Sequence, residues 1–521
     1  MIVQLFNWKF QQITAIIPEM ATNGVRYIHV SPPTLSIDRD GEWWATYQPL
    51  HYFIIEGPLG SKQRFREMCG VANGYGVGII ADCVINHMAD PRKAPLRYGD
   101  ETILRQHPLW PTFAGQYFAL PESRKMLFTK EHFFTHQKHK ITNYDSRKEV
   151  VYGNLGTLPD LDIHHTYVRR IHAEYLKFLI ELGVAGIRID AAKHLPETYV
   201  AYIANTFLRI YGTNRPIHPI VLCEIIASEK KFTKCIKPYL DTVLSDTNYQ
   251  NILFYNFPLL HKTKKLLRRR MRVCDYFETY VDGISTFNAL QFSCNHDIPY
   301  NECFRYLEIK KINQLYFVEM TNILFGHGVG YYFIDQPGSD TLYCYEASKQ
   351  RRLFELFALS KRIKPFPPME CLWSDGKDFW LGIRFREDRK DGVLTIINNT
   401  PYTYVLHSNW PSSVFSKLPD HTYDGIGMNK NEVFTIKDGK LMHTIRTIPH
   451  TVNVYGMRAT GEDEDEIEQF DTIMHRVHRK LIDGVEYIED SFDQPDRRLE
   501  ISSNLKELSH QINLLEKELS I

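Results

Sequence analysis

The sequence has no uninterrupted apolar stretch of about 18 residues, so it offers no candidate for a membrane-spanning helix. It also has no excess charge, because 62 Lys and Arg residues balance 62 Asp and Glu residues. A balanced charge argues against a polyanionic partner such as nucleic acid. We therefore expect neither a membrane-bound nor a nucleic-acid-binding protein.

Zinc-type CxxC pairs are absent too, and the nine cysteines are odd in number and scattered. That distribution favours buried free thiols over a disulfide framework. The first eight residues show no basic segment, no apolar core and no small-residue cleavage site of a secretory leader. We expect an intracellular, cytoplasmic protein, or a secreted one from which a leader has been removed.

What the sequence does contain is a set of apolar segments that end in acidic residues. Segment 184–189 carries Arg188 and is followed directly by Asp190. Three further apolar segments end in the same way, at Asp82, Glu224 and Asp297. Parallel strands of an α/β barrel are apolar on both faces and present functional groups at their carboxyl ends. Four such segments predict one active site built by one barrel.

Strand and helix patterns alternate through the first two thirds of the chain. Strands are expected at 2–6, 25–30, 77–82, 184–189, 220–224, 242–245, a segment ending at Asp297, and 330–334. Helical patterns are expected at 11–21, 61–73, 167–182 and 351–362. Eight strands in this order predict an α/β protein with a (β/α)8 TIM barrel.

Two regions depart from the alternation. Residues 88–158 are rich in His, Pro, Phe and Tyr and predict a small inserted domain after the third strand. Short strand patterns after residue 365, such as 379–384 and 392–397, predict an antiparallel β-sandwich. We therefore divide the chain into a barrel (1–87 and 159–364), an inserted domain (88–158), a β-sandwich (365–458) and a tail (459–521).

The tail combines an acidic run at 462–466 with an apolar heptad pattern. The heptad positions are Ile501, Leu505, Leu508, Ile512, Leu515 and Leu519. Three readings stay open: a helix that packs on its own protein, a coiled coil through which the chain self-associates, and a frayed end.

The strand-end carboxylates suit the hydrolysis of a glycosidic bond. A nucleophile and an acid/base about 5–5.5 Å apart give retention through a covalent glycosyl intermediate. Asp190 is our nucleophile, because Arg188 shares its strand face and would keep it ionised. Glu224 is our acid/base, since an apolar setting raises its pKa. Asp297 would stabilise the transition state, and His87 and His296 would donate hydrogen bonds to the sugar.

The segments 82–87, 186–194, 223–226 and 292–297 together resemble the four ordered sequence regions of α-amylases, glycoside hydrolase family 13. Segments 4–10, 43–49, 143–144 and 158–161 resemble the animal-type branch. The resemblance implies a barrel, an inserted B domain and a C-terminal β-sandwich, and retaining hydrolysis of internal α-1,4-glucosidic bonds in starch or glycogen. It assigns Asp190, Glu224 and Asp297 the roles given above. It also implies substrate contacts from Trp43, Trp44, Tyr47, Gln48, His87, Arg188, Lys193, His194 and His296.

The same resemblance implies a calcium ion held by Asn86, Val151, Asp160 and His194. Oxygen ligands of this kind suit calcium. Chloride activation is not expected, because Arg188 and Asn295 match the chloride ligands but the third basic position falls within Tyr331-Tyr332-Phe333. The loop 298–301 lacks the glycine-rich segment of the family, so substrate closure is expected to differ.

Two alternatives to this activity remain. A transglycosylase, or a hydrolase of short maltooligosaccharides, would use the same carboxylates and differ in how water is excluded. A non-catalytic glucan-binding scaffold would keep the fold and assemble through the C-terminal heptads. The presence of all three carboxylates favours the enzyme.

Overall fold

The computed structural model describes residues 1–38, 41–92, 96–134, 140–244, 249–278, 288–325, 329–350, 352–363, 367, 369–407 and 412–458. Residues 1–456 form one compact unit. The acidic run and the C-terminal heptads lie outside the described residues, so the three readings of the tail stay predictions.

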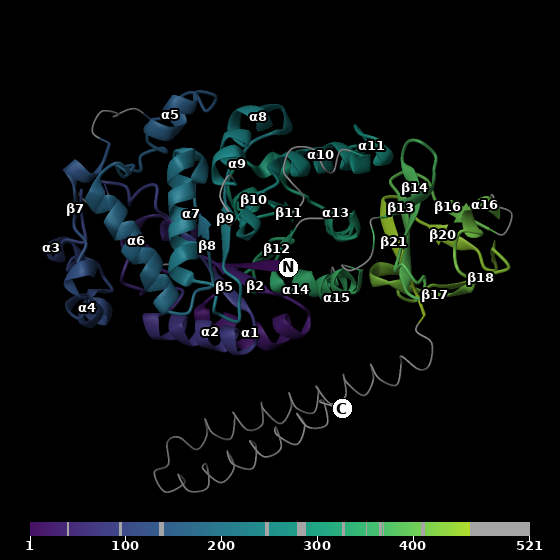
Figure 1. Cartoon of the computed structure of the whole chain (residues 1–521), viewed down its shortest axis with the longest axis horizontal. Coiled ribbons are helices and arrows are strands. Elements are labelled where there is room, and N and C mark those ends of the chain that lie inside the picture. Colours follow the sequence, from purple (N-terminus) through teal and green to yellow (C-terminus); the bar gives the residue numbers. More distant parts are fainter. Residues whose placement is uncertain are drawn as a thin grey trace, which may run out of the picture. The chain divides into compact units, whose positions relative to one another are not determined.

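Eight parallel strands close into a barrel, as predicted, in the order β1-β2-β5-β8-β9-β10-β11-β12 (Figure 1). Their bounds are β1 Ile2–Phe6, β2 Tyr27–Val30, β5 Gly78–Cys83, β8 Gly186–Ile189, β9 Ile220–Cys223, β10 Ile252–Tyr255, β11 Ala289–Phe292 and β12 Val329–Asp335. Every pair of neighbours runs parallel. Such strands are covered on both sides, which explains why they read as continuous apolar runs.

The predicted sixth strand at 242–245 was wrong. Residues 237–243 form helix α9 (Lys237–Val243), which has Pro238 in its first turn, and the sixth strand is β10 at Ile252–Tyr255. Proline is well placed at a helix start because a backbone N–H at that position would have no partner within the helix. The β-branched pair Thr242-Val243 was too short a signal to outweigh this helix start.

The main barrel helices bury an apolar face, and in α13 (Ile312–Phe325) residues 315–324 are all buried. They are α1 Phe10–Thr22, α2 Lys62–Gly74, α6 Thr166–Glu181, α7 Glu197–Tyr211, α10 Phe257–Leu267, α13 Ile312–Phe325 and α15 Leu353–Ile363. Helix α2 begins where the Ser61 hydroxyl accepts a hydrogen bond from the Arg64 amide, and its buried residues include Phe65 and Met68. Among the described residues, none of the helices combines the length and the apolar character that crossing a membrane requires.

Between β5 and α6 the described residues form only short elements. They are β6 Arg97–Tyr98, α3 Glu101–Leu104, α4 Trp110–Phe118, β7 Phe128–Thr129 and α5 Arg147–Tyr152. Further short elements elsewhere in the barrel are β3 Leu35–Ser36, β4 Pro49–His51, α8 Phe232–Cys235, α11 Val273–Glu278, α12 Asp297–Tyr300 and α14 Tyr345–Gln350.

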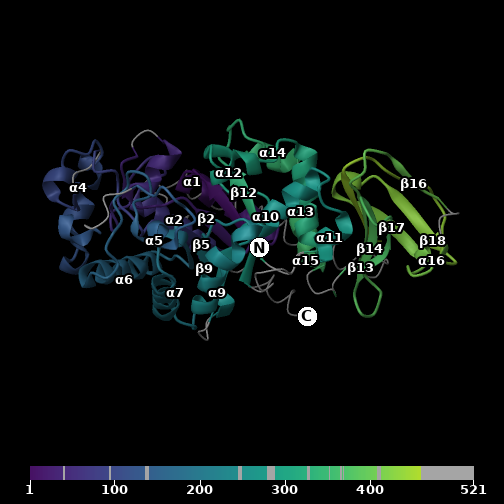
Figure 2. The same ribbon diagram turned by 90° about the horizontal axis from the view of Figure 1, so that it is seen from above.

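The C-terminal part is antiparallel. A seven-stranded sheet has the order β13-β14-β15-β21-β17-β18-β19, and β16 pairs with β20 (Figure 2). The bounds are β13 Glu370–Ser374, β14 Phe379–Phe385, β15 Gly392–Asn398, β16 Tyr404–Leu406, β17 His421–Ile426, β18 Val433–Lys437, β19 Lys440–Leu441, β20 Ile445–Thr447 and β21 Thr451–Met457, with helix α16 at Ser412–Phe415. The predicted antiparallel β architecture is confirmed.

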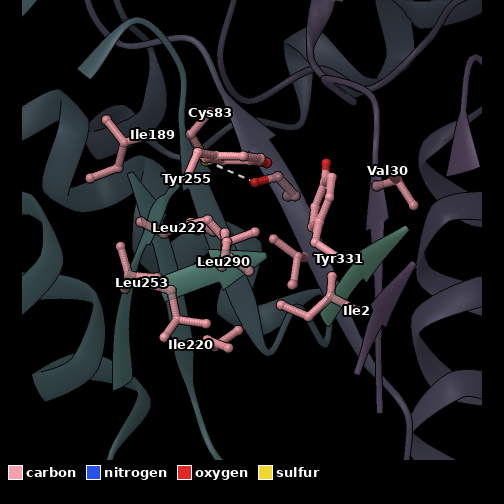
Figure 3. Packing of buried hydrophobic residues seen from close by; sticks show 14 of the residues in the cluster. Ile2, Val30, Cys83, Ile189, Ile220, Leu222, Leu253, Tyr255, Leu290 and Tyr331 are labelled. Atoms are coloured by element: carbon pink, nitrogen blue, oxygen red, sulfur yellow. Dashed lines mark hydrogen bonds between the residues drawn. The ribbon is translucent and has the colours of Figure 1, made fainter. Parts of the chain in front are cut away.

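The barrel interior changes character along its axis. Ile220, Leu222 and Leu290 are buried and gather into an aliphatic layer (Figure 3). Tyr255 and Tyr331 are equally buried, and the Tyr331 hydroxyl points away from that layer. Towards the carboxyl ends of the strands follow Asp82, Arg188 and Glu224, which are buried too.

Candidate active site

Strand register brings the predicted carboxylates together. Asp82 on β5 lies opposite Arg188 on β8. The Asp190 amide donates to the Cys83 carbonyl over 3.1 Å, and the Glu224 amide donates to the Ile189 carbonyl over 3.3 Å. The backbone hydrogen-bond ladder of β5, β8 and β9 therefore continues one residue beyond these strands. It fixes Asp190 and Glu224 at adjacent strand ends.

The Arg188 guanidinium joins three carboxylates. Its Nη1 donates to both oxygens of Asp82 at 2.8 Å and to Asp190 Oδ1 at 2.7 Å, while Nη2 pairs with Glu224 Oε1. Arg188 is only 1% exposed. A buried cation of this kind is stabilised by charge-assisted hydrogen bonds, and it fixes the relative orientation of the carboxylates it binds.

Two backbone features keep this arrangement tight. Ala191 lies in the left-handed region (φ 49°), and its amide donates to Glu224 Oε2 over 3.2 Å. Non-glycine residues in this region are uncommon and cluster at functional sites. Gly186 at the start of β8 has no room for a Cβ, which would lie 2.6 Å from an Ile220 side-chain carbon. The strand that carries Arg188 and Asp190 therefore packs closely on β9.

The protonation of Asp190 differs from the prediction. Burial raises the pKa of Asp190 to about 7, and the charges of Asp82 and Asp297 add to that increase. Arg188 opposes the shift but does not reverse it, so our expectation that Arg188 alone holds Asp190 ionised was wrong. Burial also raises the pKa of Glu224, in the direction predicted.

Asp297 is not at the end of a strand, because β11 stops at Phe292 and Asp297 opens the short helix α12. Burial raises the pKa of Asp297 well above its usual range, and the neighbouring Glu224 charge adds to this. His296 Nε2 lies 3.8 Å from Asp297 Oδ2. The three predicted carboxylates therefore influence one another in one buried cluster.

Aromatic rings surround this cluster. The Tyr47 ring stacks on the His296 ring with centroids 5.2 Å apart, and Phe6 stacks on the same imidazole. Trp43 lies 5.6 Å from the ring of Tyr300. Trp44 is exposed. Flat rings of this kind offer apolar surface with polar edges.

The remaining predicted substrate residues lie around the same barrel end. Gln48 Oε1 accepts from the Asp90 amide over 3.1 Å, and His87 Nε2 contacts the Tyr47 carbonyl at 3.1 Å. The Lys193 amide donates to the Glu224 carbonyl over 3.3 Å. Burial lowers the pKa of the Lys193 ammonium and lowers the pKa of His194 to about 3.

The predicted metal residues form two contacts. Asn86 Nδ2 donates to Asp160 Oδ1 over 3.0 Å, and the His194 ring contacts the Val150 carbonyl, next to Val151, at 3.0 Å. Asp160 Oδ2 is buried and has no hydrogen-bond partner among the described residues. Burial holds the pKa of Asp160 well above its usual range. No group of three or more His, Cys, Asp or Glu side chains that could hold a metal ion occurs in the described part of the chain, so a cation here would depend on amide and carbonyl oxygens.

Sequence reasoning left several functional contacts unassigned. Asp82 was recognised as a strand-end acid without a role, yet it is the main partner of Arg188. His29 Nε2 lies 3.5 Å from Asp82 Oδ2, and Tyr300 donates to Asp335 Oδ2 over 2.6 Å. The signal for His29 was present, since it is a polar residue inside the apolar strand Tyr-Ile-His-Val. The Tyr300 contact follows from the loop that replaces the family's glycine-rich segment.

Comparison with known proteins agrees with this geometry. Residues 10–225 match the sequence profile of a family described as "Alpha amylase, catalytic domain". An α-amylase of Aeromonas hydrophila is 28% identical over 319 residues, which cover 58% of this chain and 65% of that protein. An α-amylase-related protein of Drosophila serrata is 32% identical over 232 residues, covering 43% of this chain and 44% of that protein. The chain thus spans less than two thirds of the length of these curated relatives.

Solved structures extend the likeness to the fold as a whole. The crystal structure of α-amylase I from Eisenia fetida has a TM-score of 0.64 at 19% identity and covers 88% of this chain and 97% of that one. The α-amylase of Geobacillus thermoleovorans, solved with acarbose, has a TM-score of 0.61 at 16% identity, with 88% and 98% covered. Fold, profile and strand-end carboxylates agree: residues 10–225 of this chain match the α-amylase catalytic-domain family, and the described fold is similar to that of solved α-amylases.

Proposed function

We propose that this protein hydrolyses internal α-1,4-glucosidic bonds of starch- or glycogen-type glucans with retention of configuration. The observation that carries the proposal is the buried guanidinium of Arg188, which contacts Asp82, Asp190 and Glu224 at once. Two carboxylates held side by side at a barrel mouth, with a third against them, are the groups that a retaining glycosidase requires.

Each carboxyl group has a role that its surroundings support. The raised pKa of Glu224 favours the protonated form, which would donate a proton to the oxygen of the departing sugar. Asp190, when ionised, would attack the anomeric carbon and form the glycosyl intermediate. Glu224 would then take a proton from the incoming water. Asp297, beside Glu224, would contact the sugar at the oxocarbenium-like stage.

Aromatic residues near the carboxylates support a sugar substrate. Trp43, Tyr47 and Tyr300 are partly exposed and provide flat apolar surfaces against which pyranose faces pack in water. The same carboxylates would serve a transglycosylase or a hydrolase of short maltooligosaccharides, and product analysis separates these activities. The scaffold alternative predicts binding without turnover.

We propose also that a calcium ion links the inserted segment to the barrel. Asp160 supports this because it is a buried carboxyl group with a free oxygen, and a cation would compensate its charge. Asn86 and Asp160 would contribute side-chain oxygens, and Val151 and His194 backbone carbonyls. Chelation should lower the melting temperature, and added calcium should restore it. An Asp160→Asn variant should lose that response, whereas an unchanged melting temperature in the wild type would refute the ion.

The decisive experiment follows product size and anomeric form during hydrolysis of soluble starch and glycogen by the wild type and Glu224→Gln. The wild type should release α-configured maltooligosaccharides, and the variant should be slower by about 10²–10⁴-fold. Longer products than substrates would identify transglycosylation. Glucan binding without release of any product would identify the scaffold.

A further inference from the structure

Beneath the catalytic carboxylates, Asp82 makes four contacts with three donor groups. It accepts two hydrogen bonds from Arg188 Nη1 and one from the Tyr47 hydroxyl, each 2.8 Å long. The fourth contact is with His29, whose Nε2 lies 3.5 Å from Asp82 Oδ2. His29 and Asp82 are both fully buried. Since Asp82 orients Arg188, and Arg188 binds Asp190 and Glu224, the position of Asp82 affects the whole cluster.

The second nitrogen of His29 is also engaged. Nδ1 lies 2.9 Å from the hydroxyl of Tyr331, which is 1% exposed. The Tyr331 ring in turn meets the Tyr255 ring edge to face, with centroids 5.1 Å apart. Figure 3 shows both rings side by side above the aliphatic layer.

The protonation states of Asp82 and His29 determine which group donates and which accepts in each contact. Arg188 and His29 hold the pKa of Asp82 below its usual range, so Asp82 is ionised and only accepts hydrogen bonds. Burial lowers the pKa of His29, so its ring is neutral and carries a single proton. That proton belongs on Nε2, facing Asp82, and Nδ1 then accepts from the Tyr331 hydroxyl.

A chloride ion, which the family resemblance would place beside Arg188, does not fit these residues. The charges that act most strongly on Arg188 are those of the carboxylates Asp82, Glu224 and Asp190. The third basic position falls within Tyr331-Tyr332-Phe333, and Tyr331 is a phenol in contact with His29. One guanidinium shared among three carboxylates leaves no positive charge to balance a buried anion. The Asn295 amide, which matches a chloride ligand, is buried with no hydrogen-bond partner among the described residues.

We propose that His29 and Tyr331 are positioning residues that hold Asp82, and through it Arg188, in the catalytic orientation without an anion. This inference rests on the proposed hydrolase activity. The contact links β2 to β12, and its two residues are 302 positions apart in the sequence. Neither residue touches the substrate, so their loss should lower kcat and leave KM near its wild-type value.

Four variants test the pair. Tyr331→Phe removes the donor to Nδ1, and His29→Leu removes both contacts; each should lower kcat by about tenfold or more, because a buried hydrogen-bond partner is left unsatisfied. His29→Gln keeps an N–H for Asp82 and an oxygen for Tyr331, and should restore most of kcat. Tyr211→Phe is the matched control, since its buried hydroxyl contacts the Ile217 carbonyl, away from the carboxylates.

The outcomes separate the inference from the proposed function. A wild type that does not hydrolyse glucans refutes the proposed function itself. With an active wild type, full kcat in Tyr331→Phe, or a His29→Gln variant as slow as His29→Leu, overturns the positioning role. Sodium chloride titrated against sodium nitrate at constant ionic strength should leave wild-type kcat unchanged; a severalfold rise specific to chloride would show that an anion performs the role assigned to the pair. Melting temperatures of all variants show whether a lower rate reflects unfolding.

Discussion

The two halves of the barrel interior are equally buried and chemically opposite. Leu222 and Leu290 in the aliphatic layer belong to the buried hydrophobic core and contribute through burial. Asp82, Arg188 and Glu224, at the carboxyl ends of β5, β8 and β9, are as deeply buried but ionisable. Replacing such ion clusters by apolar residues is often neutral or stabilising, so their presence at one end of the barrel is better explained by chemistry than by stability.

The strongest test of this contrast removes the cation. Arg188→Leu leaves Asp82, Asp190 and Glu224 buried without their shared partner. We expect a loss of about 3–5 kcal/mol in the free energy of unfolding, as for other broken buried ion pairs, and loss of glucan hydrolysis. Urea unfolding and a starch assay measure the two effects. A variant that unfolds like the wild type would show that the guanidinium does not hold the cluster together.

The matching change in the aliphatic layer should affect stability alone. Leu290 is fully buried, and Leu290→Ala should lower the free energy of unfolding by about 2–5 kcal/mol through lost burial and a cavity. Its kcat and KM should stay near those of the wild type at a temperature where the variant is folded. A selective fall in kcat would mean that the two layers are not functionally separate.

A smaller effect follows from the pKa of Asp190, raised from its ordinary value of 3.8 to about 7. Between these pH values Asp190 holds more protons in the folded protein than in the unfolded chain. Its contribution to the free energy of unfolding therefore falls as the pH rises from 4 to 7. Asp190→Asn should therefore gain melting temperature relative to the wild type over that range. The wild-type kcat/KM should rise as Asp190 ionises and fall as Glu224, whose pKa is also raised, loses its proton. A flat profile across pH 5–8 would contradict the assignment.

The sequence predicted the barrel and the meeting of its carboxylates for a simple reason. Parallel strands end at one edge, so Asp82, Asp190 and Glu224 had to meet once the strands were recognised. The missed sixth strand shows the limit of short apolar runs, because four residues do not distinguish strand from helix.

Other features depend on burial in the folded protein and could not be predicted from the sequence. The pKa of Asp190 was misjudged because its burial outweighs the adjacent arginine, and the charges of Asp82 and Asp297 add to the increase. The His29–Tyr331 contact joins residues that lie near the two ends of the barrel's sequence. No local sequence pattern links them. The tail, by contrast, has a clear local pattern that no described residue tests.

The central claim is that the charged layer performs a double displacement, and trapping the intermediate tests it most directly. Glu224→Gln, incubated with an α-maltotriosyl fluoride, should react because fluoride needs no proton to leave, and should stall because no base activates water. Mass spectrometry of the digested protein should then find a maltotriosyl group on the peptide at Asp190. An unmodified peptide together with released β-configured sugar would contradict the account, since it would show single displacement by water.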